Sequence, residues 1–244
     1  MEITQTRNVR NLTKRYLSFV VALLVIAFGT SLSIRANLGS SPISCPPYVL
    51  SCIPGMPLSM GMLTIVMHVF FITAQIALLR KDFEKMQLLQ ILVSFLFGAF
   101  TDLTMWITGF MQIMDNSALG YLLRLLELLA GGAILAYGIA FEVKCDVLML
   151  AGEGFPVAIS KVVKRDFGKV KMCSDTGLVL VGIVFMLANF GRWDWELVGA
   201  GTLISMFYVG YMVRQFSPHF GWLLRYFENG AIVPYLKINL KSWH

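Results

Sequence analysis

A proline-rich segment between two apolar runs places the strongest constraint on how this chain can fold. Residues 29–57 contain five of the chain's eight prolines, together with Arg35 and Asn37. Proline lacks a backbone N–H and clashes with the preceding helical turn, so the segment cannot form one continuous helix. Its backbone cannot face lipid either, because unsatisfied N–H and C=O groups are costly there. Two alternatives follow: a broken or re-entrant segment that lines a polar cavity, or a loop outside a membrane.

The balance of apolar and charged residues identifies the class of protein. Hydrophobic residues make up 57% of the 244 residues and charged residues only 14%, whereas soluble proteins average about 25% charged residues. The chain is therefore an integral membrane protein. Its four cysteines lack the spacing of metal ligands, which predicts no metal site and favours a role as small apolar side chains. Cys45 and Cys52 fall on the predicted outer side, where oxidation is an open alternative.

Six apolar segments, each near the ~20 residues that cross the hydrocarbon core, predict the membrane-spanning helices. They cover residues 16–33, 58–79, 88–107, 121–141, 176–190 and 197–213. We therefore expect an all-α polytopic membrane protein with a single transmembrane domain over residues 1–215. The tail, residues 216–244, contains Trp222, Tyr226, Tyr235 and Trp243 among scattered charges. Aromatic residues favour the headgroup layer, which predicts an interfacial tail on the cytoplasmic side.

The distribution of lysine and arginine predicts the orientation of the chain. Seventeen of the twenty lie in four segments, residues 1–15, 80–85, 142–173 and 214–244. Arg35 and Arg192 lie on the opposite side, and Arg124 lies within a span. The positive-inside rule then places both termini of this multi-pass protein in the cytoplasm. These charges face the anionic headgroups of membrane lipids, so nucleic acid is not expected as a partner.

The two halves of the sequence share a layout. A shift of 109 residues superimposes Ala27, Gly29, Asn37 and Pro47 on Ala136, Gly138, Asp146 and Pro156. Each half contains three spans, which is an odd number, so the second half must be inverted relative to the first. We expect two inverted three-helix repeats, residues 16–107 and 121–214, with interrupted segments in corresponding positions. This pattern is typical of transporters that bind their substrate near the membrane midplane, and it favours the re-entrant alternative for residues 29–57.

A short motif in the proline-rich segment resembles a known family. Residues 34–42 read Ile-Arg-Ala-Asn-Leu-Gly-Ser-Ser-Pro, which is similar to the I-R-A-x-L-G-x-S-P signature of the bacterial YczE/YyaS/YitT family of membrane proteins. The starts of the second and sixth spans also resemble that family. The resemblance implies a polytopic protein of the bacterial cell membrane and implies no particular activity.

Polar residues at membrane depth are the candidate site residues, since a charge in the hydrocarbon region is costly and usually faces a cavity or a partner. In the first half of the chain these are Arg35, Asn37, Ser40, Ser41, Ser44, His68 and Asp102, and in the second half they are Glu142, Lys144 and Asp146. We expect Arg35 to pair with Asp102, and Arg124 to pair with Glu127 one helical turn away.

Each candidate also has a structural alternative. Arg35 can extend its side chain to the headgroups, the serines can cap a half-helix, and His68 can be a hydrogen-bonded core residue. Glu142, Lys144 and Asp146 can belong to an ordinary solvated loop. Polarity alone does not decide between these alternatives.

The motifs of common enzymes are absent from the sequence. There is no HExxH, no GxSxG and no Walker-type loop. We therefore predict that the protein is not an enzyme and uses no cofactor. The leading hypothesis is a secondary transporter for a small polar or anionic solute. The alternative is a non-transporting membrane factor that assists or anchors another protein. Assembly as a homo-oligomer is left open.

Overall fold

The computed structural model describes residues 9–111 and 117–228, and this part of the chain is all-α. It confirms a multi-pass membrane protein. The predicted polar link at Asp115 and Asn116 lies outside the described residues, as do Tyr235 and Trp243 of the tail.

The helices follow the apolar segments, with short 3-10 turns between some of them. Their bounds are α1 Val9–Arg35, α2 Cys45–Ser51, α3 Met60–Leu79, α4 Gln90–Ile107, α5 Ala118–Cys145, α6 Ala151–Val163, α7 Phe167–Phe190, α8 Ala200–Phe216 and α9 Gly221–Glu228. Within the described residues, α1, α3, α4, α5 and α7 are long and apolar enough to cross a membrane. The sixth predicted span coincides with α8, whose 17 residues extend over only about 26 Å.

Three of the spanning helices, α3, α5 and α7, begin at side chains that satisfy one of their first backbone donors. The Ser59 hydroxyl accepts a hydrogen bond from Met62 N at 3.1 Å at the start of α3. Ser117 does the same for α5 and Asp166 for α7. Such caps stabilise a helix because its first N–H groups have no partner within the helix. The Asp166 cap fixes the start of α7 at Phe167, nine residues before the start of the predicted fifth span.

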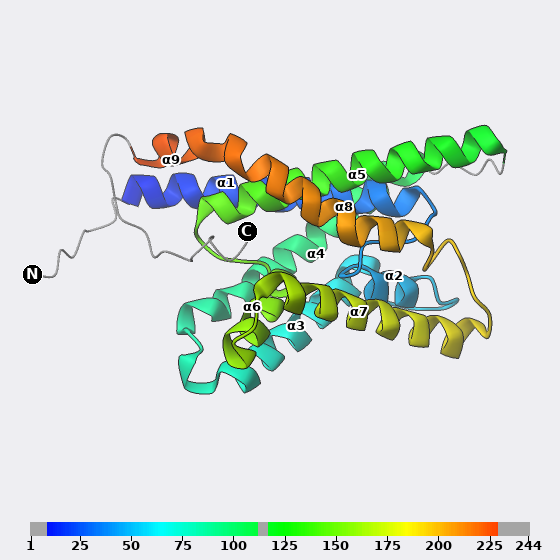
Figure 1. Cartoon of the computed structure of the whole chain (residues 1–244), viewed down its shortest axis with the longest axis horizontal. Helices are drawn as coiled ribbons and strands as arrows, with labels where there is room; N and C mark the ends of the chain where they lie inside the picture. Colours follow the sequence, from blue (N-terminus) through cyan, green and yellow to red (C-terminus); the bar gives the residue numbers. More distant parts are fainter. Residues whose placement is uncertain (1–8, 112–116, 229–244) are drawn as a thin grey trace, which may run out of the picture.

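The most extensive contact between two helices joins α1 and α5, which run in opposite directions (Figure 1). Glycine makes this contact possible. A Cβ atom on Gly29 would overlap the backbone of Leu135, and a Cβ atom on Gly138 would overlap the backbone of Ile26. Small residues let helix backbones approach closely in a membrane, where van der Waals packing replaces the hydrophobic effect as the driving force.

The proline-rich segment is interrupted, as the sequence predicts. Helix α1 ends at Arg35, and Asn37 has a φ of 51° in the left-handed region that turns the chain. The short helix α2 then begins, with Pro46 and Pro47 in its first turn, where a missing N–H costs nothing.

The α2 segment is packed inside the protein. The Cys45 thiol lies against Gly182 in the middle part of α7, and α6 packs on α3. The two interrupted segments meet, since a Cβ on Gly152 would lie 3.1 Å from Ile43 Cγ2. The interruption that follows α1 and the interruption that follows α5 therefore approach each other.

The described part of the tail folds back on the bundle. Phe220 stacks on Phe141 of α5 with ring centroids 5.4 Å apart, and the Arg15 guanidinium of α1 lies 4.7 Å from the centroid of Phe227. Trp222 and Tyr226 are exposed on the other face of α9. Helix α9 thus presents one buried face and one exposed aromatic face, and its position at the headgroup layer stays a prediction.

We expect Gly138→Val to destabilise the protein because its side chain would collide with the backbone of α1. Overpacking of this kind costs about 1–3 kcal/mol. Thermal unfolding of the purified protein in detergent measures the effect. The matched control is Gly177→Val in α7, where an added Cβ meets no atom within 4 Å. Equal unfolding temperatures for the two variants would contradict the tight α1–α5 packing.

Candidate functional site

A cavity of about 320 Å³, called the main cavity here, lies among the spanning helices. Helices α1, α3, α4, α5, α7 and α8 border it, together with residues 41–44 before α2 and residues 150–153 at the start of α6. The polar residues on its walls are Thr30, Ser41, Ser44, Thr64, His68, Thr101, Glu153, Lys171, Asp175 and Ser205. The other lining residues are mostly aliphatic and aromatic, so the cavity suits a solute with an apolar body and few polar groups.

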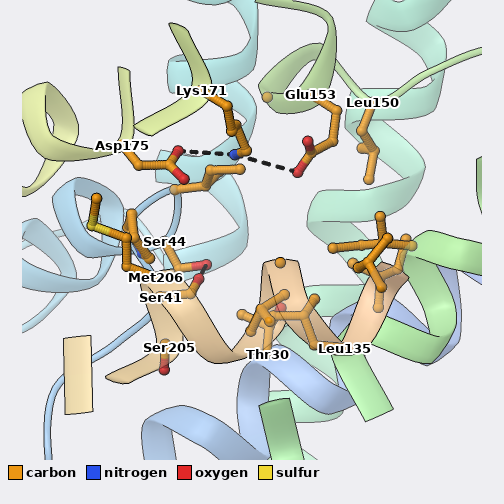
Figure 2. Close-up of a pocket in the computed structure, with 18 of the residues that line it drawn as sticks. Thr30, Ser41, Ser44, Leu135, Leu150, Glu153, Lys171, Asp175, Ser205 and Met206 are labelled. Atoms are coloured by element: carbon orange, nitrogen blue, oxygen red, sulfur yellow. Dashed lines mark hydrogen bonds and ion pairs between the residues drawn. The ribbon is translucent and has the colours of Figure 1, made fainter. Parts of the chain in front are cut away.

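Three charged side chains form a cluster on one wall of the main cavity. Lys171 Nζ lies 2.8 Å from Asp175 Oδ1 and 3.7 Å from Glu153 Oε1 (Figure 2). All three side chains are largely buried, with 10–23% of their surface exposed. Two carboxylates and one ammonium group leave the cluster with an excess of negative charge.

Lys171 and Asp175 were not among the sequence-predicted site residues. The predicted fifth span starts at residue 176, so both residues precede it. Helix α7 begins at Phe167, so both residues lie on it four positions apart. The available signals were this Lys–Asp spacing, which is typical of a helical ion pair, and Asp166 as a helix cap.

Ser41 and Ser44 lie together at the main cavity. The Ser41 hydroxyl donates a hydrogen bond of 3.0 Å to the Ser44 hydroxyl, and both residues line the cavity in front of α2 (Figure 2). Ser44 precedes α2 but its side chain forms no capping hydrogen bond. Both hydroxyl groups are therefore placed to face a solute.

His68 combines the two alternatives that the sequence left open. It lies on α3, is 1% exposed and stacks on Phe97 with ring centroids 5.6 Å apart. It also lines the main cavity, and its Nδ1 has no hydrogen-bond partner. His68 is thus a buried core residue that still has an unused ring nitrogen beside the cavity.

Arg35 and Asp102 do not pair, so that prediction is wrong. Arg35 donates to the backbone carbonyl of Met105. Asp102 accepts hydrogen bonds from the Ser59 hydroxyl at 2.6 Å and from Gly61 N at 2.7 Å. The carboxylate is occupied because it stabilises the first turn of α3. Neither Arg35 nor Asp102 lines the main cavity.

Asn37 and Ser40 are buried in the turn between α1 and α2, and neither lines the main cavity. The Asn37 Nδ2 and the Ser40 hydroxyl have no hydrogen-bond partner. The Arg124–Glu127 pair also fails to form. Arg124 lies over the ring of Tyr121, and both carboxylate oxygens of Glu127 lack a hydrogen bond.

Two of the three candidates from the second half of the chain line a different cavity. Glu142 and Asp146 line a cavity of about 230 Å³ bordered by α3, α4, α5 and α6, called the second cavity here. Glu142 Oε1 accepts a hydrogen bond of 2.8 Å from Leu150 N. Asp146 lies 3.9 Å from the Arg15 guanidinium. Lys144 lines neither cavity. The ten sequence-predicted residues thus do not form one site: three line the main cavity, two line the second cavity and five line neither.

The four cysteines form no disulfide. Cys45 is fully buried, and this burial raises the pKa of its thiol well above the usual range. The thiol therefore stays protonated at neutral pH, which agrees with a packing role against Gly182.

The chain belongs to the family of unknown function DUF6198, whose model matches residues 13–218. This range includes the spanning helices and the residues that line both cavities. No match was found among curated proteins or among solved structures. Family membership therefore leaves the activity to be inferred from the site.

We expect Lys171→Gln to destabilise the protein because it leaves Asp175 and Glu153 without their cationic partner. Leaving a largely buried charged group unpaired costs about 1–3 kcal/mol. The combined variant Lys171→Gln with Asp175→Asn should recover part of this loss. Thermal unfolding provides the measurement, and Lys161→Gln on the exposed face of α6 is the control. A Lys171→Gln variant as stable as the control would show that the cluster contributes nothing.

Proposed function

We propose that this member of the family is a secondary transporter that binds a small solute in the main cavity. The observation that carries the proposal is the meeting of the two interrupted segments, at Ile43 and Gly152, on the wall of that cavity. Transporters built from inverted repeats bind substrates at such discontinuous segments near the midplane. A non-transporting membrane factor is the alternative, and the uptake experiment below separates the two.

The contacts between α1 and α5 support the inverted repeat. Gly29 contacts Leu135, and Gly138 contacts Ile26. A shift of 109 residues converts 29 into 138 and 26 into 135. The two contacts are therefore the same contact with the helices exchanged, as expected for a two-fold axis that passes between α1 and α5.

Further pairs of residues that lie 109 positions apart have similar structural roles. Asn37 and Asp146 each follow a long helix and have positive φ angles of 51° and 49°. Arg15 and Arg124 are both buried near the start of those helices. The exchange extends to the interrupted segments, since α2 packs on α7 of the other half and α6 packs on α3. These correspondences support two repeats that run from α1 to α4 and from α5 to α8.

We further propose six passes through the bacterial cell membrane with both termini in the cytoplasm, which makes α8 a short sixth span. The charge distribution supports this orientation, and α8 packs alongside α5 and runs in the same direction in Figure 1, as this topology requires. The motif at residues 34–42 supports a relationship to the YczE/YyaS/YitT family. Assembly as a homo-oligomer stays an open part of the proposal.

The charges of the main cavity favour an uncharged or cationic solute over the anionic solute predicted from the sequence. Arg35 and Lys144, the two cationic residues among the sequence-predicted site residues, do not line the main cavity. The cavity instead contains two carboxylates and one ammonium group among mostly apolar walls. A small organic molecule with an apolar body and one amino group would complement the second carboxylate.

The topology has its own test. Reporter fusions at the C-terminus and in the loop around Arg192 should give opposite results, with a cytoplasmic C-terminus and an outer loop. A C-terminus on the outer side would contradict six passes and the inverted repeat together.

The transport proposal is tested with the full chain reconstituted in lipid vesicles. A library of small amines and neutral amphiphiles is first screened for compounds that raise the unfolding temperature, and the hits are then tested for uptake. We expect Asp175→Asn to lower uptake at least tenfold, and Ser205→Phe to block it by filling the main cavity. Asp82→Asn, on an exposed turn after α3, is the control and should transport normally. Stable binding without uptake by any variant would favour the non-transporting factor.

A further inference from the structure

The second cavity contains a carboxylate with an unused oxygen. Glu142 is 1% exposed at the inner end of α5, and its Oε2 has no hydrogen-bond partner, whereas its Oε1 accepts from Leu150 N. No ion pair of Glu142 is formed within the described residues, although the exposed Lys161 borders the same cavity. A carboxylate in this position lacks the positive partner that a buried charge requires.

Amide oxygens in the same cavity are also without donors. Gln90, at the start of α4, is 3% exposed and its Oε1 has no partner. Gln87 Oε1, in the preceding turn, is in the same state. A Cβ on Gly154 would lie 3.2 Å from Gln90 Nε2 and 3.0 Å from Gln75 Oε1, so these glutamines face α6. Three buried oxygen acceptors therefore border one cavity, and none of them receives a hydrogen bond.

We infer that the second cavity binds a monovalent alkali cation, with Glu142 Oε2 and Gln90 Oε1 as its protein ligands. Carboxylate, amide carbonyl and water oxygens are the ligands that hard cations prefer. One buried carboxylate matches a single positive charge. The described residues contain no group of three His, Cys, Asp or Glu side chains arranged for a metal ion, so the ligand set differs from that of a divalent site. The cavity volume of about 230 Å³ leaves room for water molecules that complete the coordination.

Leu150 connects the cation site in the second cavity to the main cavity. The backbone N–H of Leu150 binds Glu142, and Leu150 also lines the main cavity. A cation that holds Glu142 thereby holds the start of α6, where Gly152 and Glu153 border the main cavity. A role as the coupling ion of transport rests on the proposed function, whereas the binding of the cation does not.

The test uses the purified full-length protein in detergent. Its thermal unfolding is followed in sodium chloride and in N-methyl-D-glucamine chloride at equal ionic strength and pH, and binding of radioactive sodium is measured directly. A ligand that binds only the folded state raises the unfolding temperature, and we expect a rise of about 2–4 °C in saturating sodium. Glu142→Gln keeps an acceptor for Leu150 N but removes the charge, so the rise should disappear. Glu84→Gln removes an exposed carboxylate from the same cavity and should keep the rise.

Several results would overturn the inference. One is the absence of any response to sodium, lithium or potassium by the unmodified protein, and another is an unchanged response of Glu142→Gln. Stabilisation by acid in place of the cation, lost in Glu142→Gln, would assign the position to a proton. If Glu142→Gln does not fold, Gln90→Leu replaces it and should lower sodium binding at least tenfold. Binding is measured without transport, so a failure of the uptake experiment leaves this result interpretable.

Discussion

The close approach of α1 and α5 is the interaction on which the rest of the fold depends. Lipid tails are as apolar as leucine, so two helices associate in a membrane only where their surfaces fit closely. Gly29 and Gly138 provide that fit by removing the side chains that would separate the two backbones. Once these helices are joined, the turns that follow them, at Asn37 and Asp146, direct the interrupted segments into the protein. Helices α2 and α6 then reach α7 and α3 respectively.

Where helices are interrupted, backbone N–H and C=O groups at their ends lack partners within a helix. Carboxylate side chains and backbone groups of neighbouring segments form hydrogen bonds with them. Asp102 accepts from Gly61 N, and Glu142 accepts from Leu150 N. Gly201 N donates to the Leu38 carbonyl at 2.7 Å, an approach that an added side chain on Gly201 would prevent. An acidic residue at membrane depth is usually assigned to a functional site. Here Asp102 has a structural role that its depth alone does not reveal.

Much of the fold was predictable from the sequence because hydropathy reports where a chain can lie in lipid. It located the five spanning helices and the interrupted segment, although α7 begins nine residues before its predicted span. The site was less predictable. Ser41, Ser44 and His68 line the main cavity, whereas Arg35, Asn37, Ser40, Asp102 and Lys144 do not. Whether a polar group at a helix end faces a cavity or satisfies a backbone depends on the neighbouring helices, and sequence spacing does not contain that information. Lys171 and Asp175 were not predicted because both precede the apolar run of α7. Each compensates the charge of the other, and this allows α7 to begin before that run.

Under the proposed inverted repeat, the two halves differ in helix packing, and this difference bears on the main cavity. Helices α3 and α4 pack tightly, because a Cβ on Gly61 would overlap the carbonyl oxygen of Gly98. Helices α7 and α8, which correspond to α3 and α4 in the proposed repeat, make only marginal contact. The main cavity is lined by Lys171 and Asp175 from α7 and by Ser205 and Met206 from α8 (Figure 2). Under the proposed repeat, the main cavity is thus bordered by one helix pair that packs closely and by a corresponding pair that does not. This asymmetry, more than the charge of any single residue, favours this position for a solute.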